Sequence, residues 1–383
     1  MQEFYDIIPA FLYHSIYFIV LFILCILVCI KYSASNGNEN IIKDVPSSQL
    51  FTCFFSILII LFIGLRPISG KYFTDMPLYA HTYNNIYDGI FGGASDSRGE
   101  WLFYYMGNTC KSLGLIDREY FLVLAALYFG LMAATCWRLM RRNMYVALLF
   151  CLMSFSCYSF GVNGIRNGVA ASVMMLAITY LHIENKKHLA IALLLMFASV
   201  GIHKAMFLPG FCAVVALFWL KDPRNAIYFW ILSIFISLVA GNYVTEFFVS
   251  LGFDDRMEEY ANLDEFGEVM ESVNVKAGFR IDFILYSIMP IIMAWYVTVK
   301  RNFKDRLYNV ISSTYILANS FWIMVIRSEQ SNRFAYLSWF LYPIVIAYPL
   351  LRMSIWENQD RKLATILFLY SGFTFFMEFF YYG

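Results

Sequence analysis

Residues 11–30 read FLYHSIYFIVLFILCILVCI, and Lys31 follows them immediately. The stretch is apolar, and a helix needs about 20 such residues to cross the hydrocarbon core of a bilayer. The residues before it, Met1 to Asp6, are acidic, whereas a cleaved signal peptide begins with a basic segment. We therefore predict a retained first span that begins outside the membrane and ends inside it at Lys31.

The composition of the whole chain is also typical of a membrane protein. Of its 383 residues 60% are hydrophobic, 19% are aromatic and only 14% are charged, which leaves too little polar surface for a water-soluble domain. A net charge of +1 gives no general attraction to nucleic acid, so we expect no such partner. The eight cysteines form no Cys-x-x-Cys motif and no zinc-type spacing, so we expect neither a metal site nor a disulfide framework.

Hydropathy and polar breaks predict further spans at about residues 49–65, 119–137, 144–160, 165–183, 189–203, 205–220, 226–245, 281–299, 308–326, 334–352 and 363–381. Every second break holds a cluster of Lys and Arg, as cytoplasmic loops do, which places both chain termini outside. The expected fold is an all-α polytopic membrane protein with about 12 transmembrane helices, in a single integral membrane domain over residues 1–383.

Two predicted outer segments are longer than simple turns. Residues 66–118 include an apolar stretch from Trp101 to Leu115 that is too short to span, so we predict a re-entrant or interfacial segment. Residues 243–280 are rich in Asp and Glu and resemble an acidic outer cap. No Gly-rich phosphate loop occurs, which argues against a nucleotide-driven step and against a nucleotide cofactor.

Isolated cations lie at the predicted outer ends of the spans, against the usual positive-inside bias. They are Arg66, Arg166, Lys204, Arg280, Arg327 and Arg333. Charges that are unfavourable at a membrane edge usually have a task there, so the pattern indicates an anion-binding site on the outer surface. Two simpler interpretations stay open: Arg66 can form a structural ion pair or snorkel, and Arg327 and Arg333 can pair with Glu329.

Two of these positions also suggest a chemistry. Arg166 lies in Asn163-Gly-Ile-Arg-Asn-Gly168, which opens a predicted helix, and free backbone N–H groups at a helix start favour phosphate. A cation there is electrostatically unfavourable without an anion. His203 can transfer a proton near neutral pH, and its neighbour Lys204 adds a positive charge and should disfavour the protonated imidazole.

The order of these motifs is that of a known group of membrane enzymes. The matching residues are Gly64-Leu-Arg66 with Thr74-Asp75 and Tyr79, Glu100-Trp-Leu, Ile165-Arg-Asn-Gly-Val-Ala170, Lys186-Lys187, His203-Lys204 and Arg333-Phe-Ala-Tyr336. In these residues the chain resembles polysaccharide polymerases of the Wzy/EpsG type, among them O-antigen polymerases. The chain departs from the family at Pro67, where a polar residue is common.

This resemblance implies a metal-independent glycosyltransferase without a cofactor, located in the bacterial inner membrane with its site facing the periplasm. Such an enzyme takes oligosaccharide repeats linked to undecaprenyl pyrophosphate, moves the growing glycan onto the next repeat and releases undecaprenyl pyrophosphate. The lipid-linked oligosaccharide and the bilayer are then its partners, together with a flippase and a chain-length regulator of polysaccharide or lipopolysaccharide biosynthesis.

The candidate site follows from the leaving group and the acceptor. We expect Arg66, Arg166 and Lys204 to converge on the pyrophosphate, with Arg280, Arg327 or Arg333 completing the cradle. The remaining candidate substrate-binding residues are Glu100, Glu329, Tyr79 and Tyr336. We expect His203 to be the base and Asp75 to orient a sugar, while the reverse assignment stays open.

Other functions also fit a chain of this kind. A twelve-span secondary transporter should carry ionisable groups near the membrane midplane, whereas the candidates here lie at span ends, with Glu378 a partial exception. A lipid-linked glycan ligase uses the same donor with another acceptor, and a membrane O-acyltransferase also has a membrane histidine. The sequence leaves these alternatives open.

Overall fold

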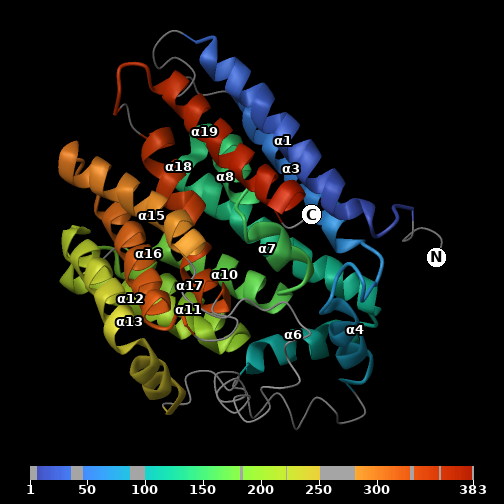
Figure 1. Cartoon of the computed structure of the whole chain (residues 1–383). Helices are drawn as coiled ribbons and strands as arrows, with labels where there is room; N and C mark the ends of the chain where they lie inside the picture. The colour runs from blue at the N-terminus through green and yellow to red at the C-terminus, as the bar shows by residue number, and fades with distance from the viewer. Residues whose placement is uncertain are drawn as a thin grey trace. The chain divides into compact units, whose positions relative to one another are not determined.

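The chain is helical throughout the part that its computed structural model describes, which comprises residues 7–35, 46–86, 100–181, 184–220, 222–250, 281–327, 332–352 and 355–381 (Figure 1). No strand occurs among these residues, which confirms the all-α class. The segments long and apolar enough to cross a membrane are Leu12–Ser33, Asp117–Leu152, Arg224–Gly241, Ile281–Lys300, Arg333–Arg352 and Gln359–Tyr381. Shorter apolar helices add to them, and the number of twelve spans stays a prediction.

The residues group into two compact units, which we call unit 1 (Met1–Lys204 and Ile346–Gly383) and unit 2 (Ala205–Val345). Unit 1 holds α1 (Leu12–Ser33), α3 (Pro46–Gly64), α4 (Met76–Asn84), α6 (Trp101–Ser112), α7 (Asp117–Met140), α8 (Met144–Leu152), α9 (Cys157–Val162), α10 (Ile165–Ile178), α11 (Lys186–Ile202) and α19 (Gln359–Phe376). Unit 2 holds α12 (Phe207–Trp219), α13 (Arg224–Ser250), α15 (Ile281–Trp295), α16 (Arg306–Met324) and α17 (Asn332–Trp339), and α18 (Tyr342–Arg352) crosses the boundary. The single membrane domain stays a prediction.

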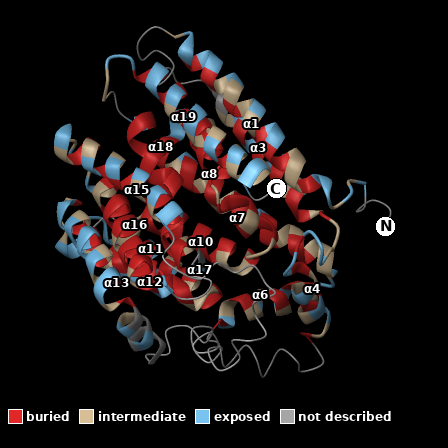
Figure 2. Cartoon of the chain, viewed as in Figure 1, coloured by how far each residue is buried: buried red, intermediate tan, exposed pale blue. Residues whose placement is uncertain are grey.

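The core of unit 1 forms around α7 and α10. Helix α10 packs against both α7 and α11, and α3 packs against α7. Small residues allow these backbones to approach, as is usual between membrane helices. A Cβ atom on Gly64 of α3 would lie only 2.9 Å from the Cα atom of Leu122 on α7. Helix α8 is buried along nearly its whole length (Figure 2).

Unit 2 is held by a buried polar network between three helices. Trp230 of α13 donates its ring N–H to Asn319 of α16 at 2.8 Å. The amide group of Asn319 donates in turn to the hydroxyl of Ser338 on α17 at 3.0 Å. Hydrogen bonds of this kind hold helices together where the surroundings offer no water.

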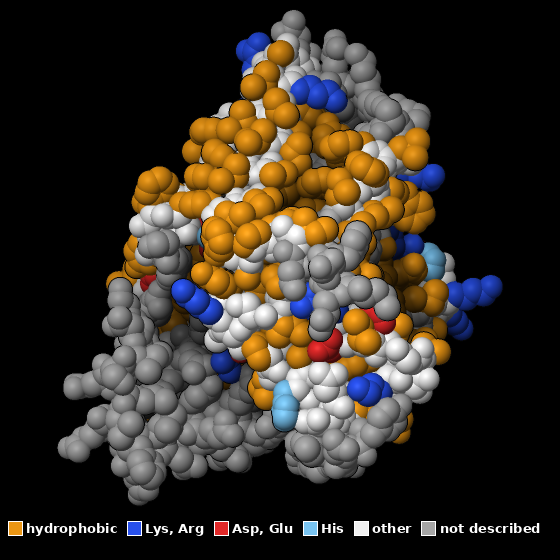
Figure 3. Space-filling view, turned by 90° about the vertical axis from the view of Figure 1, so that its right-hand side faces the viewer, with side chains coloured by type: hydrophobic (Ala, Val, Ile, Leu, Met, Phe, Trp, Pro, Cys, Tyr) orange, Lys and Arg blue, Asp and Glu red, His pale blue; other side chains and the backbone are white. Residues whose placement is uncertain are grey.

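The outer surface of unit 1 is suited to lipid. Exposed apolar side chains follow α1, among them Ile19, Ile23 and Leu27, and they continue on α3, for example at Phe54 and Leu61. Hydrophobic side chains cover much of the upper part of the face in Figure 3. Exposed apolar patches of this extent mark a surface that another apolar phase covers. The chain is therefore a multi-pass membrane protein.

Most helices lie where hydropathy places them, but several stretches differ in detail, and the predicted span 334–352 is divided between α17, which ends at Trp339, and α18, which begins at Tyr342. The predicted span 144–160 is broken, since α8 ends at Leu152 and α9 begins at Cys157. The apolar stretch from Trp101 forms the short helix α6, which buries Phe103, Gly107 and Cys110 on one face. Such one-sided burial fits an interfacial helix. Of the predicted acidic cap, residues 251–280 lie outside the described residues.

Candidate functional site

Three helix ends in unit 1 bring together candidate residues that are far apart in the sequence. Glu100 stands directly before α6, Arg166 is in the first turn of α10, and His203 directly follows α11. Glu100 is separated from Arg166 by 66 positions and from His203 by 103. The contacts of α11 with α6 and α10 bring these ends together.

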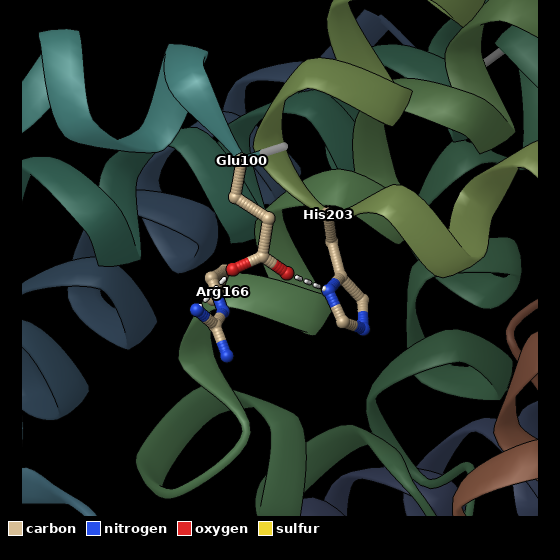
Figure 4. A network of polar contacts seen from close by, with 3 residues as sticks. All are labelled: Glu100, Arg166 and His203. Atoms are coloured by element: carbon tan, nitrogen blue, oxygen red, sulfur yellow. Dashed lines mark hydrogen bonds and ion pairs between the residues drawn. The ribbon is translucent and has the colours of Figure 1, made fainter. Parts of the chain in front are cut away.

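The Glu100 carboxylate binds both other residues, one with each oxygen. Its Oε2 accepts a hydrogen bond from Nη1 of Arg166, and its Oε1 lies 2.5 Å from Nδ1 of His203 (Figure 4). The Glu100 side chain is 7% exposed, and those of Arg166 and His203 are each 16% exposed. We call this arrangement the Glu100–Arg166–His203 cluster.

Local packing fixes the position of His203. Its backbone is extended (φ −147°, ψ 115°), so α11 ends there and the side chain turns away from the helix. Gly201 in the last turn of α11 lets the ring of Trp101 lie directly on this helix. A Cβ atom on Gly201 would come within 2.9 Å of the ring. Ser199, four positions before His203, donates its hydroxyl to the Ala170 carbonyl of α10 at 2.7 Å.

The cluster is arranged for proton transfer beside a positive charge. In the neutral tautomer that carries its proton on Nδ1, His203 donates a hydrogen bond from Nδ1–H to the Glu100 carboxylate and keeps a lone pair on Nε2, the nitrogen that points away from Glu100. That nitrogen can take a proton from a substrate hydroxyl. The same carboxylate supplies the anion that Arg166 requires at a helix start. The Arg166 side chain, which carries the other N–H groups of the guanidinium, is still partly exposed.

Helix α4 approaches the cluster through two aromatic rings. The ring centroid of Tyr79 lies 6.0 Å from that of Phe103 on α6, and the guanidinium carbon of Arg166 lies 6.0 Å from the same Phe103 centroid. Asp75 is exposed and stands one helical turn before Tyr79, directly ahead of α4. Residues four positions apart share a helix face, so Asp75 lies on the side of α4 that carries Tyr79.

Arg66, expected at the outer surface, lies in the interior of unit 1. Its side chain is among the largest that are fully buried, at 1% exposure. Nη1 donates to the Ile63 carbonyl at 2.6 Å and Nη2 to the Val162 carbonyl at 3.0 Å. These bonds hold the end of α3 against the end of α9. Direct binding of pyrophosphate by Arg66 stays a prediction.

The candidates of unit 2 are dispersed over its helices. Arg327 is exposed after α16, with Nη2 3.4 Å from the Leu238 carbonyl of α13, and Arg333 is exposed in the first turn of α17. Tyr336 of α17 packs edge-on against Trp339, with ring centroids 5.5 Å apart. Arg280 and Glu329 lie outside the described residues. Their convergence with Arg166 on one anion stays a prediction.

All three residues of the cluster are candidates from the sequence, but the sequence does not predict their pairing. Lys204 is the charge expected to act on His203, whereas in the structure a carboxylate oxygen of Glu100 contacts the ring. Lys204 is half-buried at the start of the turn Lys204–Met206. The only sequence signal for the pairing is the position of Glu100 directly before an apolar helix.

Metal binding is not indicated within the described ranges. No group of three or more His, Cys, Asp or Glu side chains lies close enough together there to hold a metal ion. The expectation of metal-independent chemistry stays a prediction.

Comparison with known proteins places the chain in one family. Residues 49–383, nearly the whole chain, match the EpsG family. No curated protein and no solved structure matches the chain. This match begins within α3 and includes every residue of the cluster.

Proposed function

Because the chain belongs to the EpsG family, a family of polysaccharide polymerase-type membrane proteins, we propose that it polymerises oligosaccharide repeats linked to undecaprenyl pyrophosphate. The reaction takes place at the outer face of the bacterial inner membrane. The growing glycan moves from its lipid to the next lipid-linked repeat. The observation that carries this proposal is the Glu100–Arg166–His203 cluster, which holds a candidate base and a candidate pyrophosphate ligand on one carboxylate.

The reaction needs one proton acceptor and one cation. The acceptor hydroxyl oxygen forms a bond to the anomeric carbon of the donor glycan, and the bond from that carbon to the pyrophosphate oxygen breaks. Nε2 of His203 takes the hydroxyl proton, and Glu100 stabilises the imidazolium that results. Arg166 stabilises the negative charge that develops on the departing undecaprenyl pyrophosphate, together with the N–H groups at the start of α10.

The remaining candidates have supporting roles in this proposal. Lys204 and the arginines at positions 280, 327 and 333 complete the pyrophosphate cradle. Asp75 orients a sugar from the side of α4, next to Tyr79. The donor lipid already carries the energy for the new glycosidic bond, which agrees with the lack of a nucleotide-binding motif in the sequence.

The test is a polymerisation assay in membrane vesicles of both orientations, supplied with lipid-linked repeats. We expect a ladder of glycans that differ by one repeat, formed in sealed vesicles whose original outer face is accessible. A single transfer without a ladder would indicate a ligase. Transport of the lipid-linked repeat without any glycan transfer would indicate a transporter and would contradict the proposal.

Replacing Arg166 with lysine separates its charge from its fork-shaped geometry. Lysine can still pair with Glu100, but it offers a point charge where arginine offers a second pair of N–H groups to a phosphate. We expect shorter polymers and a slower reaction with Arg166→Lys. With Arg166→Ala we expect the rate of polymer formation to fall by about 10²- to 10³-fold, the usual effect of removing one hydrogen-bond donor to a developing anion.

Expression level and melting temperature of both variants should be compared with the wild type. Polymers of normal length from a folded Arg166→Ala protein would remove this residue from the site.

A further inference from the structure

Arg66 is a buried cation that the proposed reaction does not use directly. It lies two residues beyond the end of α3 and makes no ion pair with any described residue. Burial lowers the pKa of its guanidinium to about 10, so the side chain still carries its charge at neutral pH. A buried charge of this kind is unfavourable unless its surroundings satisfy it.

Carbonyl groups and aromatic rings surround the Arg66 guanidinium, while its buried Nε atom has no hydrogen-bond partner among the described residues. Besides the carbonyls of Ile63 and Val162, the rings of Phe73 and Phe121 lie with their centroids 5.4 and 5.5 Å from the guanidinium carbon. Such cation–π contacts are strongest away from water. Both terminal nitrogens are therefore engaged, and the side chain is covered.

The bond to Val162 connects Arg66 with the candidate site. Val162 is the last residue of α9, and Arg166 follows four positions later in the first turn of α10. A carbonyl at a helix end has no partner within its own helix, so an external donor fixes the direction in which the chain leaves. Arg66 is that donor, at 3.0 Å.

The corner between α9 and α10 transmits this restraint, because it is short and tightly packed. The backbone N–H groups of Asn163 and Gly164 both donate to the Ser159 carbonyl, at 2.8 and 3.1 Å. A Cβ atom on Gly168 would lie 2.8 Å from the carbonyl oxygen of Phe160. Little freedom is left between Val162 and Arg166.

We propose that Arg66 is a positioning residue, which holds the α9–α10 corner to the end of α3 and thereby sets the place of Arg166 in the Glu100–Arg166–His203 cluster. The proposal rests on the proposed function only for its effect on catalysis. Its structural part, the restraint on the corner, stands independently.

The structural part is tested by hydrogen exchange on the purified wild type, Arg66→Met and Arg66→Lys proteins. We expect faster exchange of the amides at 163–168 in Arg66→Met, and a smaller change in Arg66→Lys, whose ammonium can still reach one carbonyl. Arg138→Met is the matched control, since Arg138 of α7 also has a buried Nε atom and packs on the Tyr180 ring at 3.5 Å. It should leave these amides unchanged. Unchanged exchange at 163–168 in a folded Arg66→Met or Arg66→Lys protein overturns the proposal.

The catalytic part is tested by a double-mutant cycle in the polymerisation assay. Arg66→Met should reduce polymer formation strongly when Arg166 is present and only slightly in the Arg166→Gln background. Arg66→Lys should recover part of the rate, and Arg138→Met should behave like the wild type. An equal loss in both backgrounds means that Arg66 acts independently of Arg166, by direct binding or by general stability, and overturns the proposal. Absence of any polymer from the wild type would count against the proposed function, while the exchange result would still decide the structural part.

Discussion

Replacing His203 with alanine is expected to slow polymer formation by about 10²- to 10⁴-fold, the usual contribution of a positioned general base. The expectation rests on the contact of 2.5 Å between Nδ1 and Glu100, which leaves Nε2 for the acceptor hydroxyl. Added imidazole should restore part of the rate in the His203→Ala protein, because a free base can enter the space of the missing ring. The measurement is the initial rate of ladder formation, with expression matched.

A control for this variant exists within the same unit. His14 of α1 also pairs with a glutamate, since its Nε2 lies 2.9 Å from Oε2 of Glu378. His14→Ala removes a comparable pair that shares no residue with the cluster and should polymerise at close to the wild-type rate. If His203→Ala polymerises normally while Asp75→Asn is inactive, the roles of His203 and Asp75 are reversed. If both are active, neither residue is the base.

Replacing Glu100 with glutamine is expected to have an effect as large as the loss of His203. A neutral amide cannot bind Arg166 and His203 as the carboxylate does, and it does not stabilise an imidazolium. The proton on the ring is then no longer directed to Nδ1. We expect the rate to fall by about 10²- to 10⁴-fold, the range for losing acid–base catalysis. Leaving a buried polar partner unpaired costs about 1–3 kcal/mol, so the melting temperature should fall as well.

The double variant distinguishes a shared function from two separate ones. If Glu100 acts through His203, the protein with both Glu100→Gln and His203→Ala should be hardly slower than either single variant, since residues that act as a unit are not additive. Glu378→Gln, which removes the carboxylate of the other His–Glu pair, should keep a near-normal rate. A normal rate in Glu100→Gln beside an inactive His203→Ala would show that His203 works without this carboxylate.

The sequence alone determined the class of the protein and most of its helices. The first predicted span, residues 11–30, is found as α1 (Leu12–Ser33), and the apolar run predicted to end at 203 is found as α11, which ends at Ile202. These features depend on hydrophobicity along a single segment, which is visible in the order of residues. The break between α8 and α9 was missed because Ser154–Ser156 interrupt the helix without interrupting its apolar character.

The sequence also selected the residue types of the site, since Glu100, Arg166 and His203 were all candidates before their positions were known. Only the tertiary structure decided which of them meet. Glu100 contacts residues 66 and 103 positions away, whereas Arg66, which follows the carboxyl end of α3 and carries the same charge as Arg166, turns into the core. Helix periodicity is a local property, but the partner of a side chain at a helix end depends on how whole helices pack. That packing buries Arg66 as a structural support and leaves Arg166 partly exposed as a candidate pyrophosphate-binding residue.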